Sequence, residues 1–509
     1  MRTKKTFSNI FWGFAYELIA IICGFIVPRL VLTSFGSQYN GVTSAVSQFM
    51  QVIALFQAGI GGVTMAALYK PLVEKDTKKI SVIVKTTEGF MRKIVLTFLV
   101  FTVLLAYIYP FSINDEFDWF FTFTLVLIMS LSTIAQYFFG QTYQFLLNAD
   151  QCQRIISIVN TIKLVANTFI FAVMIKNGYG IREVKLTAAV VYIAAPILLN
   201  IYTKKKYRLI PSVAKDNSVI KQRWDNFGQQ VAVFISVNTS FIVLTLFSTI
   251  YEISVYAVYS LIFNGIYGLL LPLTKGVEAA FGNMLAKEEH ERIFINLRIY
   301  EQVVFAATTF LYAVALITAI SFISLYTARV TDVSYYRPTF LYIMIAANVF
   351  RCFRFPYEGI CIAAGHFRQT RNPAFIEAGL NIIISVSLVF SLGIIGVAIG
   401  SLVAFVFRTI RFALYMSRNI VERSIRPFIK RVILSGMCIL LIVGINSTIP
   451  LSNPHNYMSW MLNAIIVSVI AVIPVALVEV IFYRGDLMVL LAMIKGVRKK
   501  RKTTVSFSP

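Results

Sequence analysis

The sequence has 509 residues, of which 58% are hydrophobic and only 14% are charged. A soluble globular domain has roughly 25% charged residues, so the composition excludes that class and indicates a polytopic membrane protein. The formal net charge of +24 does not require a nucleic-acid partner, and we predict none, because membrane topology and anionic membrane lipids explain it.

Apolar runs of about 20 residues, the length that crosses a bilayer, predict fourteen transmembrane helices. Their ranges are 10–34, 42–68, 92–111, 119–146, 155–175, 186–202, 229–248, 253–274, 300–326, 338–364, 373–392, 394–415, 430–447 and 457–482. The predicted fold class is therefore an all-α membrane protein. The first run is too long for a signal-peptide core and lacks a small-residue cleavage site, so we expect it to remain as the first helix.

Lys and Arg are concentrated in the N-terminus, in alternate loops and in the C-terminus, where Lys495 to Lys502 is the densest run. Positive loops stay on the cytoplasmic side, so both termini are predicted to be cytoplasmic. The loops on the opposite side are short and leave no room for an external catalytic domain. We therefore predict that the protein is not an enzyme and that its function lies within the membrane.

A weak internal repeat divides the chain. A shift of 213 residues places Leu72 on Leu285, and a shift of 212 places Tyr39 on Tyr251. Each shift spans six predicted helices, so two parallel six-helix lobes related by an axis along the membrane normal are expected. The predicted domains are an N-terminal lobe (1–202), a cytoplasmic linker (203–227), a C-terminal lobe (228–416), two extra helices (417–483) and a basic cytoplasmic tail (484–509).

Charged residues also lie inside the predicted spans of the N-terminal lobe. Glu17 lies near the cytoplasmic end of the first span and Arg29 near its external end. For Arg29, snorkelling to the membrane surface and lining a cavity both remain open. Lys163 lies near the middle of the fifth span, where snorkelling is longest, so we expect it to line a cavity or to have a buried partner.

Two polar stripes repeat at helical spacing. They consist of Ser44, Gln48 and Gln51 in the second span and Gln136, Gly140 and Gln144 in the fourth. Each stripe either lines a cavity or provides hydrogen bonds between helices.

The tenth span carries the densest charge. Arg351, Arg354 and Glu358 fall on one face of a helix, and Pro356 is expected to kink it beside them. Two arginines within a membrane require water, a partner or a bound anion. Arg354 and Glu358, at i and i+4, can also simply neutralise each other.

The predicted membrane interior is cationic. No aspartate lies at a mid-membrane position, and a positive chamber suits phosphate, which arginine binds through its planar fork. Arg408 and Arg411, near the cytoplasmic end of the twelfth span, are expected to snorkel and are left out of the site. Three scattered histidines and five cysteines without a CxxC pair predict no metal and no cofactor.

The chain resembles the oligosaccharide-lipid flippases of the polysaccharide transporter family, in the superfamily that also holds multidrug and toxin extrusion proteins and lipid II flippases. The stretches that carry the resemblance are PRLVLTSFG from Pro28 to Gly36, YNG from Tyr39 to Gly41, ALFQAGIG from Ala54 to Gly61 and AALYKP from Ala66 to Pro71. Fourteen spans in two six-helix lobes with a final extra pair agree with the family along nearly the whole chain.

The resemblance implies a flippase in a bacterial plasma (inner) membrane that moves a polyprenyl-diphosphate-linked oligosaccharide outward by alternating access. The lipid tail would stay in the bilayer, where the thirteenth and fourteenth helices can border a groove for it. A polysaccharide polymerase and glycosyltransferases of the same pathway are implied partners. The substrate-binding residues we predict are Arg29, Lys163, Arg351 and Arg354. Those predicted to couple an ion or to line the cavity are Glu17, Gln48, Gln51 and Glu358.

Two other functions remain open. A drug or cation antiporter of the same fold would use buried carboxyl groups such as Glu17 or Glu358 as proton sites. A membrane-embedded polymerase or glycosyltransferase would need an acid or base on a sizeable loop, which the short external loops do not offer.

Overall fold

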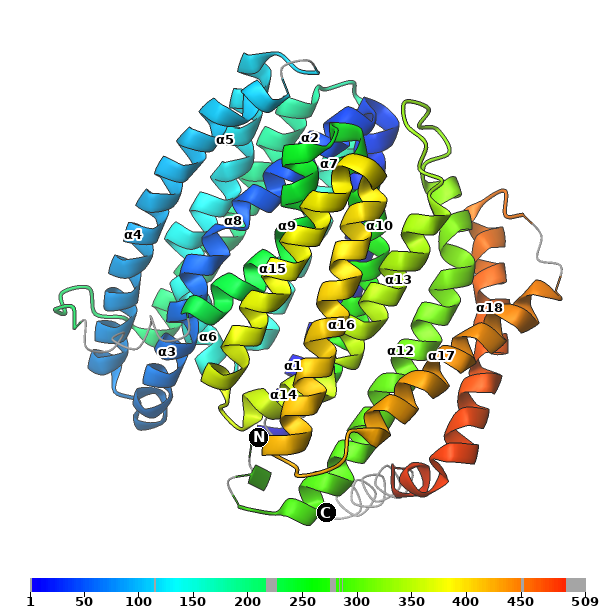
Figure 1. The fold of residues 1–509 in the computed structure, drawn as a ribbon. Coiled ribbons are helices and arrows are strands. Elements are labelled where there is room, and N and C mark those ends of the chain that lie inside the picture. Colours follow the sequence, from blue (N-terminus) through cyan, green and yellow to red (C-terminus); the bar gives the residue numbers. More distant parts are fainter. Residues whose placement is uncertain are drawn as a thin grey trace, which may run out of the picture. The chain divides into compact units, whose positions relative to one another are not determined.

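The computed structural model describes residues 2–113, 116–216, 227–274, 281–282, 284–285, 287–449 and 453–490. Every regular element in these ranges is a helix (Figure 1), as the composition predicts. Within them, eleven helices are long and apolar enough to cross a membrane. The chain is a multi-pass membrane protein, and the count of fourteen spans stays a prediction.

The chain divides into two compact units, the first formed by Met1–Leu261 with Arg329–Val333 and the second by Ile262–Ala328 with Ser334–Pro509. The domain boundaries given above stay predictions. Residues 217–226 of the predicted linker and 491–509 of the predicted tail lie outside the described residues.

The first unit contains α1 (Arg2–Phe35), α2 (Ser37–Met50), α3 (Ile53–Glu74), α4 (Thr77–Ile108), η1 (Tyr109–Ser112), α5 (Trp119–Ala135), η2 (Gln136–Gly140), α6 (Gln141–Ala149), α7 (Gln153–Lys176), α8 (Ile181–Tyr207), α9 (Phe227–Phe247) and the start of α10 (Ile250–Leu270). The second contains the end of α10 and α12 (His290–Tyr326), α13 (Pro338–Phe353), α14 (Phe355–Ala363), α15 (Phe367–Leu392), α16 (Ile394–Asn419), α17 (Arg426–Ser447) and α18 (Tyr457–Phe482).

Several of the predicted spans are interrupted within the described residues. The second is divided between α2 and α3 at Gln51 and Val52, and the fourth contains the π turn η2 between α5 and α6. The tenth breaks at Arg354, between α13 and α14. Pro356 explains this last break, because it has no N–H to donate to the preceding turn. Irregular backbone of this kind within membrane helices is tolerated where it lines a cavity or is buried in protein.

The beginnings of α2 and α10, which the predicted repeat pairs with each other, are in contact. The Asn40 side-chain amide donates to the Ser254 hydroxyl over 2.8 Å, and that of Gln38 donates to the Tyr251 hydroxyl. Gly41 packs directly on Ile250, where a Cβ would overlap the Ile250 carbonyl. The absence of a side chain at Gly41 therefore allows the two helices to approach this closely.

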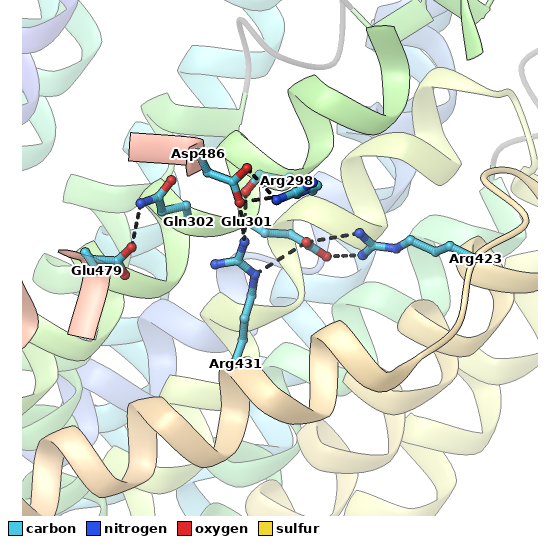
Figure 2. Close-up of polar contacts among 7 residues, drawn as sticks. All are labelled: Arg298, Glu301, Gln302, Arg423, Arg431, Glu479 and Asp486. Carbon is cyan, nitrogen blue, oxygen red and sulfur yellow. Dashed lines mark hydrogen bonds and ion pairs between the residues drawn. The ribbon is translucent and has the colours of Figure 1, made fainter. Parts of the chain in front are cut away.

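The last two helices, which lie outside the predicted repeat, pack on α12 and on each other (Figure 1). Figure 2 shows the polar contacts that join them. Glu301 of α12 is fully buried and pairs with Arg423, which precedes α17, and with Arg431 of α17, whose Nε lies 3.5 Å from its carboxylate. A buried carboxylate is tolerable because two guanidinium groups surround it.

The same cluster extends to the end of α18. Asp486 pairs with Arg298 of α12 over 2.8 Å and with Arg431 over 3.8 Å. Within α18 itself, Glu479 accepts a 2.6 Å hydrogen bond from the Gln302 amide of α12 (Figure 2). Because apolar helices in lipid gain little from packing on one another, these polar contacts specify how α17 and α18 attach to α12.

Candidate functional site

A buried ionic group surrounds the helix break at Arg354. The Arg354 guanidinium lies 3.1 Å from Glu358 and 3.0 Å from Glu377 of α15. Arg408 of α16 lies 3.6 Å from the other oxygen of Glu377 and donates to the Thr370 carbonyl over 2.8 Å. We call Arg354, Glu358, Glu377 and Arg408 the Glu377 cluster. Its two acids balance its two arginines.

The Glu377 cluster changes the interpretation of two arginines. Arg408, which was expected to snorkel, is only 3% exposed, because Glu377 and the Thr370 carbonyl provide partners within the protein. Arg354 pairs with two carboxylates, not with Glu358 alone. Glu377 is not among the site residues predicted from the sequence. An acidic residue within the first turns of an apolar span was the available signal.

Arg351 has different neighbours. Its guanidinium carbon lies 4.1 Å from the ring centre of Tyr267 and 5.7 Å from that of Phe405. Its buried Nε has no hydrogen-bond partner, and no carboxylate of the described chain forms an ion pair with it. A cation over an aromatic face gains about 0.5–2 kcal/mol, which leaves its charge available to an anion.

The first unit contains a cavity of about 440 Å³ bounded by α1, α2, α5, α7 and α8. We call it the N-terminal cavity. Hydroxyl and amide groups supply its polar lining, chiefly those of Gln51, Ser132, Gln136, Tyr137, Asn167 and Tyr192. Lys185 is the only charged group among its described lining residues. Next to it, the Lys163 ammonium lies 4.8 Å from the ring centre of Tyr192.

Two of the helix interruptions shape this cavity. Gln51 lines it from the junction of α2 and α3, and Gln136 lines it from the first position of the π turn. Gly140, at the end of that turn, packs against Pro196 of α8, whose Cβ would lie 2.5 Å from a Cβ at Gly140. π turns are frequent at functional sites, because they shift side chains out of the regular helical order.

The remaining predicted residues of the first unit lie elsewhere. Glu17 is exposed on α1, and Arg29 is half-buried on the same helix. Gln48 lines a separate small cavity of about 20 Å³ with Asn238 and Thr245. The stripe through Gln48 and Gln51 is therefore not continuous in the structure, because the helix breaks at Gln51.

The second unit carries an apolar groove of about 780 Å³ bordered by α12, α13 and α17. Its walls are mainly aliphatic and aromatic, and include Ile317, Tyr342, Val349, Phe353, Ile439 and Leu440. Its polar groups are few, with Ser435, Asn446 and Ser447 all contributed by α17. The groove suits a hydrocarbon chain and not a polar solute.

No protein-family model matches the sequence, and no curated protein matches it significantly. Solved structures do match. The lipid II flippase MurJ in an inward closed conformation has a TM-score of 0.72 at 16% identity, with 94% of this chain and 100% of that chain covered. An inward-facing multidrug resistance MATE family transporter of the MOP superfamily has a TM-score of 0.61 at 12% identity, with 79% and 95% covered. The Vibrio cholerae MATE transporter VcmN in the bent form has a TM-score of 0.56 at 13% identity, with 82% and 97% covered.

These likenesses define a class. The chain has the fold that the lipid II flippase MurJ and the MATE transporters share. The predicted likeness in fold to lipid II flippases and to multidrug and toxin extrusion proteins is thus confirmed.

Proposed function

We propose that the chain is a flippase that moves a polyprenyl-diphosphate-linked oligosaccharide from the cytoplasmic to the outer leaflet of a bacterial inner membrane, for cell-surface polysaccharide synthesis. Both termini would be cytoplasmic. The observation that carries the proposal is the likeness to a lipid flippase over 94% of the chain. A polymerase and glycosyltransferases of the same pathway would act before or after it.

The apolar groove supports a lipid-linked substrate. It is bordered by α17, one of the two helices that the predicted repeat does not explain. Its volume of about 780 Å³ falls within the range of roughly 300–1,000 Å³ that small-molecule sites occupy. A polyprenyl chain could pack against the apolar walls of this groove, which contain no charged residue among the described lining.

The cationic residues support a diphosphate. Arg351 presents a guanidinium that no described carboxylate neutralises, and its planar fork matches phosphate oxygens. Arg29 and Lys163 of the first unit remain proposed contacts. Arg354, whose charge Glu358 and Glu377 balance, is proposed to act with Arg351 by holding the helix break in place.

Substitution of Arg351 tests the function. Purified protein in vesicles that contain a lipid-linked oligosaccharide would be assayed for the appearance of sugar in the opposite leaflet. Arg351→Gln should abolish most transport, and Arg351→Lys should retain part of it, because the charge remains but the fork is lost. Arg418→Gln, at an exposed arginine in the last turn of α16, is the matched control and should transport normally. Full transport by Arg351→Gln would contradict the proposed role.

A drug or cation antiporter is the second candidate, favoured by the likeness to the MATE transporters. It is the weaker one, because such a protein needs an acidic site for its cation. No carboxylate is among the described lining of the N-terminal cavity, and Glu358 and Glu377 are paired with arginine. Export of a cationic dye with no effect on lipid-linked sugar would favour this candidate.

A further inference from the structure

The N-terminal cavity holds positive charge without a matching negative charge. Lys185 lines it, and its ammonium lies 5.6 Å from the ring centre of Phe171. The Lys163 ammonium lies next to Tyr192, another lining residue. Neither lysine forms an ion pair with a carboxylate of the described chain, although four other buried or half-buried cations, Arg354, Arg408, Arg423 and Arg431, do so.

A positive charge at the wall of this cavity is costly where it is removed from water. Removing such an ion from water costs several kcal/mol, whereas an aromatic face returns only about 0.5–2 kcal/mol. An anion bound in the cavity would neutralise this positive charge. Water can hydrate the lysines but carries no opposing charge.

A second feature of the same cavity indicates a ligand. Asn167 lines it and is 6% exposed, yet its side-chain Oδ1 has no hydrogen-bond partner. Buried amides are almost always hydrogen-bonded, so a group that enters the cavity is expected to satisfy it. Because the amide O and N positions are interchangeable by a flip, Asn167 can either accept from a ligand or donate to it.

We propose that the N-terminal cavity is a phosphate-binding site. Lys185 supplies a positive charge at the cavity wall, and Lys163 lies beside the lining residue Tyr192. The hydroxyl and amide groups of Gln51, Gln136 and Ser132 match the several oxygen atoms of a phosphate. The ligand is a phosphate or diphosphate group, either free or as the headgroup of a lipid. This inference does not depend on the proposed function. If the headgroup is that of the transported lipid, the cavity is part of the transport site.

Binding measurements test the site on the full chain in nanodiscs of phosphatidylcholine. The first probe is radiolabelled inorganic diphosphate, and the second is a polyprenyl diphosphate added to the discs. Lys185→Gln should weaken binding by about tenfold or more, as expected for the loss of a charged hydrogen-bond donor. Lys185→Arg should retain binding. Lys176→Gln, at an exposed lysine at the end of α7, should bind as the unmodified protein does.

The results separate the two sources of phosphate. Loss of both ligands in Lys185→Gln supports a headgroup site. Binding of inorganic diphosphate alone, lost in Lys185→Gln, supports a free-anion site and contradicts the flippase proposal while it leaves the phosphate site standing. Absence of diphosphate binding in the unmodified protein, or equal binding by Lys185→Gln and Lys176→Gln, overturns the inference. Lys163→Gln is a second variant, which decides the matter if Lys185→Gln does not fold.

Discussion

Replacing Glu377 by Gln removes the carboxylate that contacts both Arg354 and Arg408. The two arginines are affected differently. Arg354 keeps its 3.1 Å contact with Glu358. Arg408 keeps the Thr370 carbonyl and the face of Phe412, 4.3 Å away, but loses the one carboxylate with which it forms an ion pair in the described chain. The effect of the substitution thus reports mainly on a buried Arg408 without its ion-pair partner.

The expected loss of stability follows from the burial of the Glu377–Arg408 pair. The side chains of Glu377 and Arg408 are 5% and 3% exposed, and breaking such a buried pair on one side costs about 3–5 kcal/mol. Glu358→Gln is the matched control. Its side chain is 27% exposed and Arg354 keeps Glu377, so we expect a loss of about 1 kcal/mol or less.

The melting midpoint in detergent, followed by loss of the monodisperse peak in size-exclusion chromatography, measures both effects. Glu377→Gln should melt several degrees below Glu358→Gln. Adding Arg408→Met to Glu377→Gln should recover most of the loss, because the unpaired charge is removed and an apolar chain of similar length fills its place. Equal midpoints for Glu377→Gln and Glu358→Gln would refute the reasoning.

Four other predictions follow from single features. The charge swap Arg354→Glu with Glu358→Arg, which the i, i+4 spacing alone predicts to preserve folding, should lower the melting midpoint, because a carboxylate at position 354 would stand beside Glu377. Gly140→Ala should lower the midpoint by crowding Pro196, at about 1–3 kcal/mol, whereas Gly62→Ala, with open space around it, should not. Burial raises the pKa of Asp150, but hydrogen bonds from Lys206, Tyr207 and Cys152 outweigh it and lower that pKa below 3.8. The stabilisation by Asp150 is therefore complete above pH 3.8 and is lost as the pH falls through its lowered pKa, so the difference in midpoint between the unmodified protein and Asp150→Asn should shrink in acid. A single cysteine at Asn453 should react with an impermeant thiol reagent in intact cells and one at Lys78 should not, in a background without the five native cysteines; the reverse pattern would overturn the orientation.

The helices could be predicted because lipid imposes a simple rule on sequence. A spanning segment must be apolar over about 20 residues, and each predicted span is helical where the structure describes it, apart from short interruptions. The interruptions were less accessible. Pro356 predicts the break at Arg354, but the break at Gln51 has no Pro or Gly beside it. Gly140 ends the π turn at Gln136, but a single Gly does not distinguish a π turn from an α-helix.

The site was predictable only where the contacts are local. Arg351, Arg354 and Glu358 could be placed together because helical periodicity acts over one or two turns. Glu377 and Arg408 belong to α15 and α16, and tertiary packing alone brings them to Arg354. Lys185 was missed for another reason. Arg182, Glu183 and Lys185 lower the local hydropathy, so the predicted span began after them, whereas α8 begins at Ile181.

The π turn also affects how this helix can tolerate deletions. A π turn closes its hydrogen bonds over one residue more than an α turn does, so Gln136–Gly140 contains a surplus residue. Elsewhere, losing one residue of α5 would rotate all following side chains by about 100° and would move Gly140 away from Pro196. A deletion at Gln136 or Tyr137 would instead convert the π turn to an α turn and leave α6 in register. Variation in chain length can thus remodel the cavity wall while the helix packing behind it is conserved.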